Sequence, residues 1–120
     1  MKHVAAILLS AGLIGCAAQK ARIQTAPWDK SEIVGHRFKL VATDQVEVFS
    51  FQTDGNVAAT IGTPDAVAGP LMSWHLDSGG VLIVKDEETE IKLQKLYLKS
   101  NTVEVLRNAQ PATYKVTNEN

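Results

Sequence analysis

Apolar and polar side chains alternate along most of the chain after Ile33, in short runs separated by residues that favour turns. An alternation with a period of two predicts β-strands that bury one face. Eight runs are expected to form strands, at residues 33–43, 45–53, 57–61, 71–76, 81–85, 89–100, 102–107 and 113–116. Because most connections are too short for crossovers, the pattern predicts an all-β fold, a small antiparallel up-and-down barrel of about eight strands.

The clearest turn signal is Thr53-Asp54-Gly55-Asn56, because Asp-Gly and Gly-Asn pairs adopt the positive φ angles of a tight hairpin. In the run before it, the apolar positions change parity between Val48 and Phe49. Two explanations stay open at this point: both faces of the strand are partly covered, or a β-bulge resets the register.

Three other stretches depart from simple alternation. Residues 62–70 contain two glycines and two prolines and are expected to be a loop without a regular element. Residues 89–100 fit a helix as an alternative, but their neighbours are hairpins, which favours a strand with a bulge near Gln94 and Lys95. The polar end, residues 118–120, is expected to be frayed.

The start of the chain has a different character. Met1-Lys2-His3 is short and basic, and a run of about eleven mostly apolar residues follows, from Val4 to Ile14. A helix that crosses a bilayer needs about 20 such residues, so this run is too short to span one. A basic start, a short apolar run and a small residue at its end predict a secretory signal peptide over residues 1–15.

Leu13-Ile14-Gly15-Cys16 resembles the lipobox of bacterial lipoproteins. The resemblance implies that the Cys16 thiol carries diacylglycerol and that Cys16 is the mature N-terminus, a stable lipid anchor once two or more acyl chains are present. In that family an Asp after the cysteine favours retention at the inner membrane, and Ala17 stands there in this chain. The resemblance therefore implies the bacterial outer membrane, facing the periplasm. An ordinary signal peptide with a chance cysteine is the alternative.

The predicted organisation is a signal peptide (1–15), a lipidated cysteine and tether (16–27) and one β-barrel domain (28–120). A short helix is the alternative for the tether. Lys2 is the only one of 12 basic residues in the leader, so 11 remain against 13 acidic ones, and this balance does not favour nucleic acid as a partner. Cys16 is the one cysteine, so the domain has no disulfide and depends on its core.

From Phe49 onward the chain resembles the small lipocalin-like domains of bacterial lipoproteins. The residues that carry the likeness are Phe49 to Gly55, an aromatic strand with an Asp-Gly turn, and Trp74-His75-Leu76 followed by Gly80 to Val84, a tryptophan hairpin. Residues 91–96 and 103–105 match the next two strands. The resemblance covers about the last two-thirds of the chain and implies a fold and a tether, with no particular ligand.

One position departs from that family. Its first strand often carries Gly-x-Trp, and the corresponding Gly35-His36-Arg37 has arginine at the third position. The tryptophan that usually closes one end of the barrel is therefore missing or moved, and Trp28 lies a few residues upstream.

Catalytic and metal-binding patterns are weak. The mature chain has two histidines, His36 and His75, in separate predicted strands, whereas zinc sites use three or four close ligands. None of its serines sits in a Gly-x-Ser-x-Gly turn, and Gly79-Gly80 is explained as a β-turn. We therefore expect a protein that is not an enzyme and needs no metal or cofactor.

Four aromatic residues could line a ligand pocket, namely Phe38, Phe49, Phe51 and Trp74. They could equally form the packed core, since an eight-stranded barrel has room either for its own side chains or for one small ligand. We favour the packed core because the domain has few aromatic residues and, without a disulfide, needs its apolar side chains for stability. Two functional classes follow. The first is an interaction module of the cell envelope that binds a protein partner. The alternative is a lipocalin-like carrier of a small apolar ligand, or an inhibitor of a periplasmic enzyme. An open edge strand with a filled interior would favour the first class.

Overall fold

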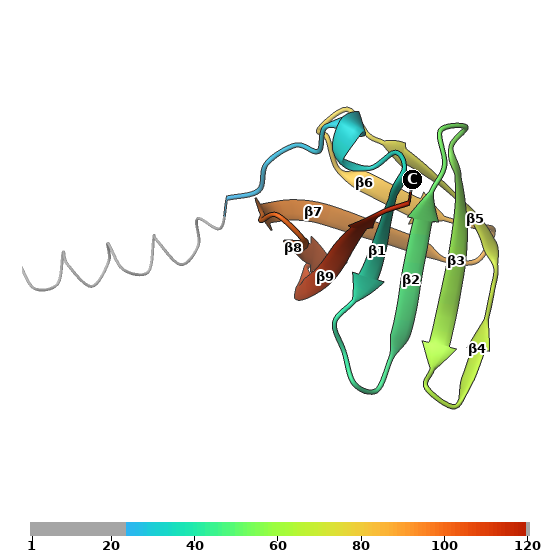
Figure 1. Ribbon diagram of the computed structural model, residues 1–120. Helices are drawn as coiled ribbons and strands as arrows, with labels where there is room; N and C mark the ends of the chain where they lie inside the picture. The colour runs from blue at the N-terminus through green and yellow to red at the C-terminus, as the bar shows by residue number, and fades with distance from the viewer. Residues whose placement is uncertain (1–23, 120) are drawn as a thin grey trace, which may run out of the picture.

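A computed structural model describes residues 24–119, and this part of the chain is a closed antiparallel β-barrel (Figure 1). The signal peptide, Cys16 and most of the tether lie outside the described residues. A short 3-10 helix, η1, precedes the strands. Its bounds and those of the nine strands within residues 24–119 are η1 Lys30–Glu32, β1 His36–Leu40, β2 Val46–Phe51, β3 Asn56–Thr63, β4 Ala66–Ala68, β5 Leu71–Leu76, β6 Leu82–Lys85, β7 Glu90–Leu98, β8 Thr102–Arg107 and β9 Gln110–Asn118.

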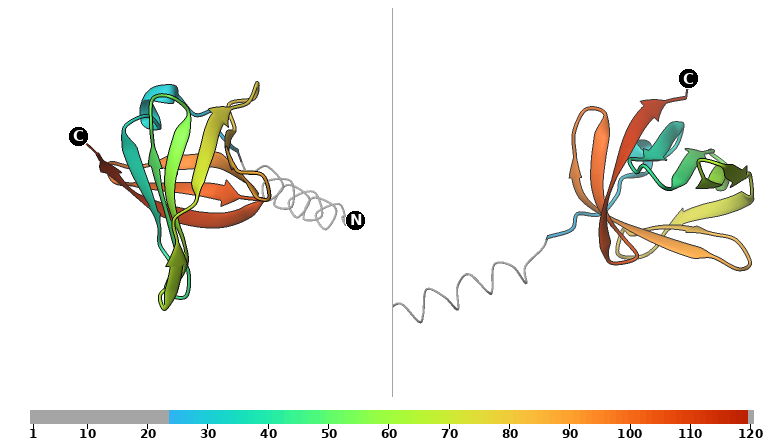
Figure 2. Two further views of the ribbon diagram at one scale, coloured as in Figure 1. Left: turned by 90° about the vertical axis from the view of Figure 1, so that its right-hand side faces the viewer. Right: turned by 90° about the horizontal axis from the view of Figure 1, so that it is seen from below.

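Eight of these strands close the barrel. Each pairs with its neighbours in the order β1-β2-β3-β5-β6-β7-β8-β9, and β9 pairs back onto β1. The remaining strand, β4, pairs only with β3. All pairings are antiparallel, so the predicted all-β, up-and-down barrel of about eight strands is confirmed. The two views of Figure 2 show the strands wrapped around one interior. No helix of the described chain is long and apolar enough to cross a membrane.

The interior of the barrel is lined by the alternate residues of each strand, as the pleat of a β-strand requires. The buried apolar side chains form one cluster, which includes Phe38, Phe49, Val57, Leu93 and Val103 among its fully buried members. Since the cluster draws on β1, β2, β3, β7 and β8, it holds together strands that are far apart in the sequence.

Strand β2 settles the parity question at Val48 and Phe49. It pairs with β1 and β3 in an unbroken register, so the bulge is wrong as an explanation. The side chains of Glu47, Phe49 and Phe51 face the interior, and Val46 and Val48 are half-buried on the other face. Both faces are partly covered, because the chain places a glutamate on the inward side.

The expected loop over residues 62–70 is also wrong. Strand β3 continues to Thr63, a two-residue turn follows, and β4 returns along β3. Strand β5 then pairs with β3 in the same register, since Ile61 lies opposite Ala68 and Val57 lies opposite Met72. Thus β4 and β5 are one strand interrupted at Gly69-Pro70. The ladder breaks there because proline has no N–H to donate.

The turn between β2 and β3 has the predicted form, with Gly55 at φ 88°. The irregularity expected in β7 is present too, as a register shift between Lys95 and Tyr97. The chain end differs from expectation. Strand β9 extends to Asn118, and the Glu119 amide donates to the Gly35 carbonyl at 2.9 Å, so these residues are paired and not frayed.

The segment before η1 is fastened to the barrel. The Ala26 amide donates to the Lys95 carbonyl at 2.8 Å, and the Trp28 amide donates to the Gly80 carbonyl at 2.9 Å. Gly80 has a φ of 80°, and a Cβ added there would lie 2.4 Å from the Pro27 side chain. This close approach and backbone conformation both require glycine.

Candidate functional site

The four aromatic residues that the sequence singled out come together inside the barrel. Phe38, Phe49, Phe51 and Trp74 are between 0% and 6% exposed. The Phe51 ring centre lies 5.0 Å from that of Phe38, 5.9 Å from Phe49 and 6.0 Å from Trp74. The Trp74 indole nitrogen donates to the Gln52 carbonyl at 2.9 Å. These rings contact one another, each pair adding about 0.5–1.5 kcal/mol beyond the burial of its area.

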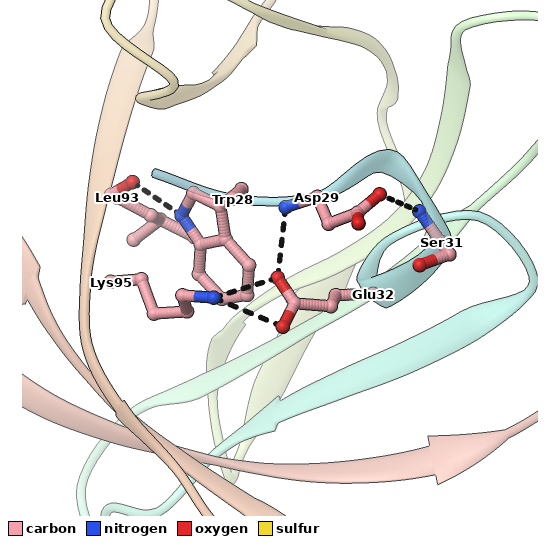
Figure 3. Close-up of polar contacts among 6 residues, drawn as sticks. All are labelled: Trp28, Asp29, Ser31, Glu32, Leu93 and Lys95. Atoms are coloured by element: carbon pink, nitrogen blue, oxygen red, sulfur yellow. Dashed lines mark hydrogen bonds and ion pairs between the residues drawn. The ribbon is translucent and has the colours of Figure 1, made fainter. Parts of the chain in front are cut away.

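Trp28 extends this aromatic cluster, and Figure 3 shows its hydrogen bond to Leu93. Its side chain is 5% exposed, its ring lies 5.6 Å from that of Phe38, and its indole nitrogen donates to the Leu93 carbonyl at 2.9 Å. A tryptophan that lies eight residues before β1 thus packs inside the barrel. Its buried N–H is satisfied, which removes the main cost of burying an indole.

Polar groups on the segment before β1 hold Trp28 in place. The Lys95 ammonium lies 5.6 Å from the centre of the Trp28 ring and bonds both carboxylate oxygens of Glu32, at 2.8 and 3.0 Å. Glu32 also accepts from the Asp29 amide, and the Asp29 side chain accepts from the Ser31 amide, which completes a capping box (Figure 3). This arrangement ties η1 to β7, and we call it the Trp28 clamp.

A second polar cluster lies inside the barrel, where the sequence analysis had placed only apolar groups. Glu47 is 2% exposed, and Arg107 donates to its two carboxylate oxygens from Nε at 3.0 Å and Nη2 at 2.6 Å. The hydroxyl of the fully buried Tyr114 also donates to Glu47. One carboxylate from β2 therefore joins β8 and β9. A buried ion pair is favourable only when its hydrogen bonds are this complete.

The cluster changes the acid–base properties of two of its members. Burial, and secondarily the charge of Glu47, raises the pKa of the Tyr114 hydroxyl above its ordinary value of 10.0. The hydrogen bond to Glu47 raises the pKa of Arg107, although burial works against it. Tyr114 therefore stays a neutral donor and Arg107 a cation, which is the arrangement that a buried carboxylate needs.

The signal for this cluster was present in the strand parity. Glu47 shares the parity of Phe49 and Phe51, and Arg107 shares the parity of Val103 and Val105, so both positions face inward. Simple alternation of apolar and polar residues does not predict charged side chains on the inner face, so this pair was not expected from the sequence. The indication was a charged residue in phase with the core positions of each of two strands.

Several hollows lie at the surface of the described barrel. One, a groove of about 570 Å³, lies between β5 and the β6–β7 turn, beside Leu71, Met72 and Lys85. A smaller hollow of about 340 Å³ lies where β1 leads into β2, next to Leu40 and Arg107. A third hollow, of about 290 Å³, borders Phe51 beside Gly35 and Glu119. None of the three is lined by Phe38, Phe49 or Trp74.

The other candidate chemistry is dispersed. His75 is exposed on β5, and His36 is half-buried with Nδ1 3.2 Å from the Val34 carbonyl oxygen. Within residues 24–119 no three His, Cys, Asp or Glu side chains are grouped to share a metal ion. Cys16 lies outside the described residues.

Comparison of the chain with protein-family models, with curated proteins and with solved structures gives no match. The class that can be stated is therefore that of the fold, a small closed antiparallel β-barrel.

Proposed function

We propose that this chain is a lipid-anchored bacterial lipoprotein whose lipocalin-like barrel is a non-enzymatic interaction module of the cell envelope. Leu13 to Cys16 support the anchor, and the position of Ala17 supports the outer membrane, facing the periplasm. The membrane is then one partner, through the lipid, and an envelope protein is the other.

The observation that carries the proposal is the packing of the barrel interior. A carrier of the lipocalin kind needs an internal space of several hundred Å³ for its ligand. In this chain the corresponding volume holds the aromatic cluster around Phe51 and the ion pair of Glu47 with Arg107. An apolar ligand would have to displace rings that are 0% to 6% exposed, or desolvate a buried ion pair. The outer surface is therefore the better candidate for binding.

The tethered half of the proposal is tested by metabolic labelling. Cells expressing the full chain should incorporate labelled palmitate into it, and Cys16→Ser should abolish the label and leave soluble or unprocessed protein. Ser10→Ala, in the same apolar leader, is the matched control and should keep the label. Continued labelling of Cys16→Ser would refute the anchor.

A further inference from the structure

The strand formed by β4 and β5 has an edge that is only half covered. Strand β5 pairs with β6 from Leu76 to Ser73, where Ser73 lies opposite Lys85. Beyond Lys85 the chain turns away into β7, since the Asp86 amide donates to the Thr89 carbonyl. Residues 66–71 therefore pair with β3 on one side and with no described strand on the other.

The register identifies which backbone groups face this open edge. The Trp74 amide donates to the Gly55 carbonyl, and the Ala59 amide donates to the Pro70 carbonyl, so even-numbered residues of this strand point toward β3. In an antiparallel ladder the intervening residues point the other way. The N–H and C=O groups of Val67, Gly69 and Leu71 thus face away from β3, on the side where no strand among residues 24–119 pairs with them.

Two usual protections of an edge strand, charged side chains and a proline whose nitrogen faces solvent, are absent from residues 66–71. Such edges normally carry charged side chains, or a proline whose nitrogen faces solvent. The sequence here is Ala-Val-Ala-Gly-Pro-Leu, which has no charge, and Pro70 directs its nitrogen toward β3. Val67 is 55% exposed and Leu71 is 72% exposed. The open edge is therefore apolar and still able to form backbone hydrogen bonds with an added strand.

The groove of about 570 Å³ lies where a strand added to this edge would meet the barrel. One wall is Leu71 and Met72, and the other is the β6–β7 turn with Asp86, Glu87 and Glu88. Lys85 is the single cation of the groove. The Asp86 carboxylate accepts from two amides of its own turn, whereas Glu87 and Glu88 form no ion pair within residues 24–119.

From these observations we propose that the open edge, residues 66–71, binds an extended basic segment of a partner protein by strand addition. The inference rests on the proposed interaction function and identifies its surface. Backbone groups of residues 67, 69 and 71 supply the hydrogen bonds, Val67 and Leu71 contact apolar side chains of the added strand, and Glu87 and Glu88 attract its basic ones. A second copy of this chain fits less well, because edge-to-edge pairing brings Asp65 and the acidic turns of two copies into one interface.

The test uses the full chain in mild detergent and two labelled hexapeptides, acetyl-(Lys-Val)3-amide and acetyl-(Glu-Val)3-amide. Six extended residues span about 20 Å, enough to cover residues 66–71. Fluorescence anisotropy should show saturable binding of the lysine peptide that weakens with added salt, and no saturable binding of the glutamate peptide. A lysine peptide with N-methylated valines should bind at least about tenfold more weakly, because it cannot complete the ladder.

Variants of the chain locate the binding. Val67→Pro removes an outward N–H and leaves the pairing with β3, so it should weaken the lysine peptide about tenfold, whereas Val67→Thr keeps the N–H and should bind within about threefold of wild type. Glu87→Lys/Glu88→Lys should reverse the preference between the two peptides. Residues 66–68 lie outside the buried core, and Glu87 and Glu88 are exposed. All of these variants should therefore unfold at the same temperature as wild type.

Each outcome is decisive. Equal binding of both peptides, or full binding by Val67→Pro, overturns the inference. A dimer of the full chain that Val67→Pro abolishes also overturns it, with a second copy as the occupant. Another outcome is that the open edge binds neither peptide while photo-cross-linkers on another face capture one reproducible envelope protein. In that case the edge assignment fails and the interaction function stands. If no face binds a peptide or cross-links a protein, and an acyl ligand co-purifies with the chain, the interaction function fails as well.

Discussion

Arg107 and Glu47 lie 60 residues apart in the sequence and meet inside the barrel through two hydrogen bonds, of 2.6 and 3.0 Å. Glu47 is almost fully buried, and the Arg107 side chain is 26% exposed. The pair links β2 to β8, which are not neighbours in the barrel. It therefore constrains the distance between two strands that are not adjacent, which the pairing of neighbouring strands does not do.

Removing one partner of this pair should be costly. Arg107→Leu leaves a buried carboxylate without its cation, which typically lowers the free energy of unfolding by about 3–5 kcal/mol. Because the Arg107 side chain is 26% exposed, we expect a loss of about 3 kcal/mol. Glu47→Leu/Arg107→Leu/Tyr114→Phe should recover most of that loss, because neither a buried charge nor an unpaired buried hydroxyl remains. Urea unfolding of both variants measures the difference. Equal stability of Arg107→Leu and wild type would contradict the role of the pair.

Tyr114 should make the barrel sensitive to alkali. Its raised pKa means that the folded chain keeps the phenolic proton at a pH where the unfolded chain releases it. The contribution to stability is therefore fully present below about pH 10, the ordinary value, and is lost as the pH rises above it.

This is measurable in Tyr97→Phe, where Tyr114 is the single tyrosine, since the chain has only two. Its free energy of unfolding should fall by up to about 1.4 kcal/mol per pH unit above pH 10. Tyr97→Phe/Tyr114→Phe should lack this component. The same alkaline slope in both variants would show that another group is responsible.

The strand pattern could be predicted from the sequence because it depends on local alternation and turn chemistry. The Asp54-Gly55 turn, the strand at residues 102–107 and the irregularity in β7 are all where these signals indicated. Residues 62–70 were misinterpreted because two prolines and two glycines outweighed a register that only the pairing with β3 reveals. A long hairpin tolerates Gly69-Pro70 when one hydrogen bond of the ladder is given up.

The interior was less predictable than the strands. Strand parity indicates that Glu47 and Arg107 face inward, but it does not indicate that these two residues and Tyr114 meet one another. The same holds for Trp28, whose place in the barrel follows from its bond to Leu93, 65 residues away. Long-range pairing of this kind is the information that one sequence lacks.

The Trp28 clamp should contribute to stability through both packing and its hydrogen bond. Trp28→Ala should lower the free energy of unfolding by about 3–5 kcal/mol, as for other large core aromatics. Trp28→Phe keeps most of the packing but leaves the Leu93 carbonyl without its donor, and should cost about 1–3 kcal/mol. Lys99→Met, which removes an ammonium that lies 5.6 Å from the centre of the exposed Tyr97 ring, is a control expected to have little effect. Chemical denaturation would refute the clamp if Trp28→Ala and Lys99→Met behaved alike.

In the proposed function, the barrel is filled by its own side chains and binds its partner through its outer surface. Native mass spectrometry of the full chain, released from detergent micelles in the presence of excess palmitate, tests it most directly. The predicted spectrum contains the chain with its covalent lipid and no additional stoichiometric acyl ligand. The contradicting result is one non-covalent palmitate per chain that is lost on unfolding. It should also be lost in Phe51→Trp, because a larger ring crowds the interior. That result would identify the protein as a carrier of a small apolar ligand.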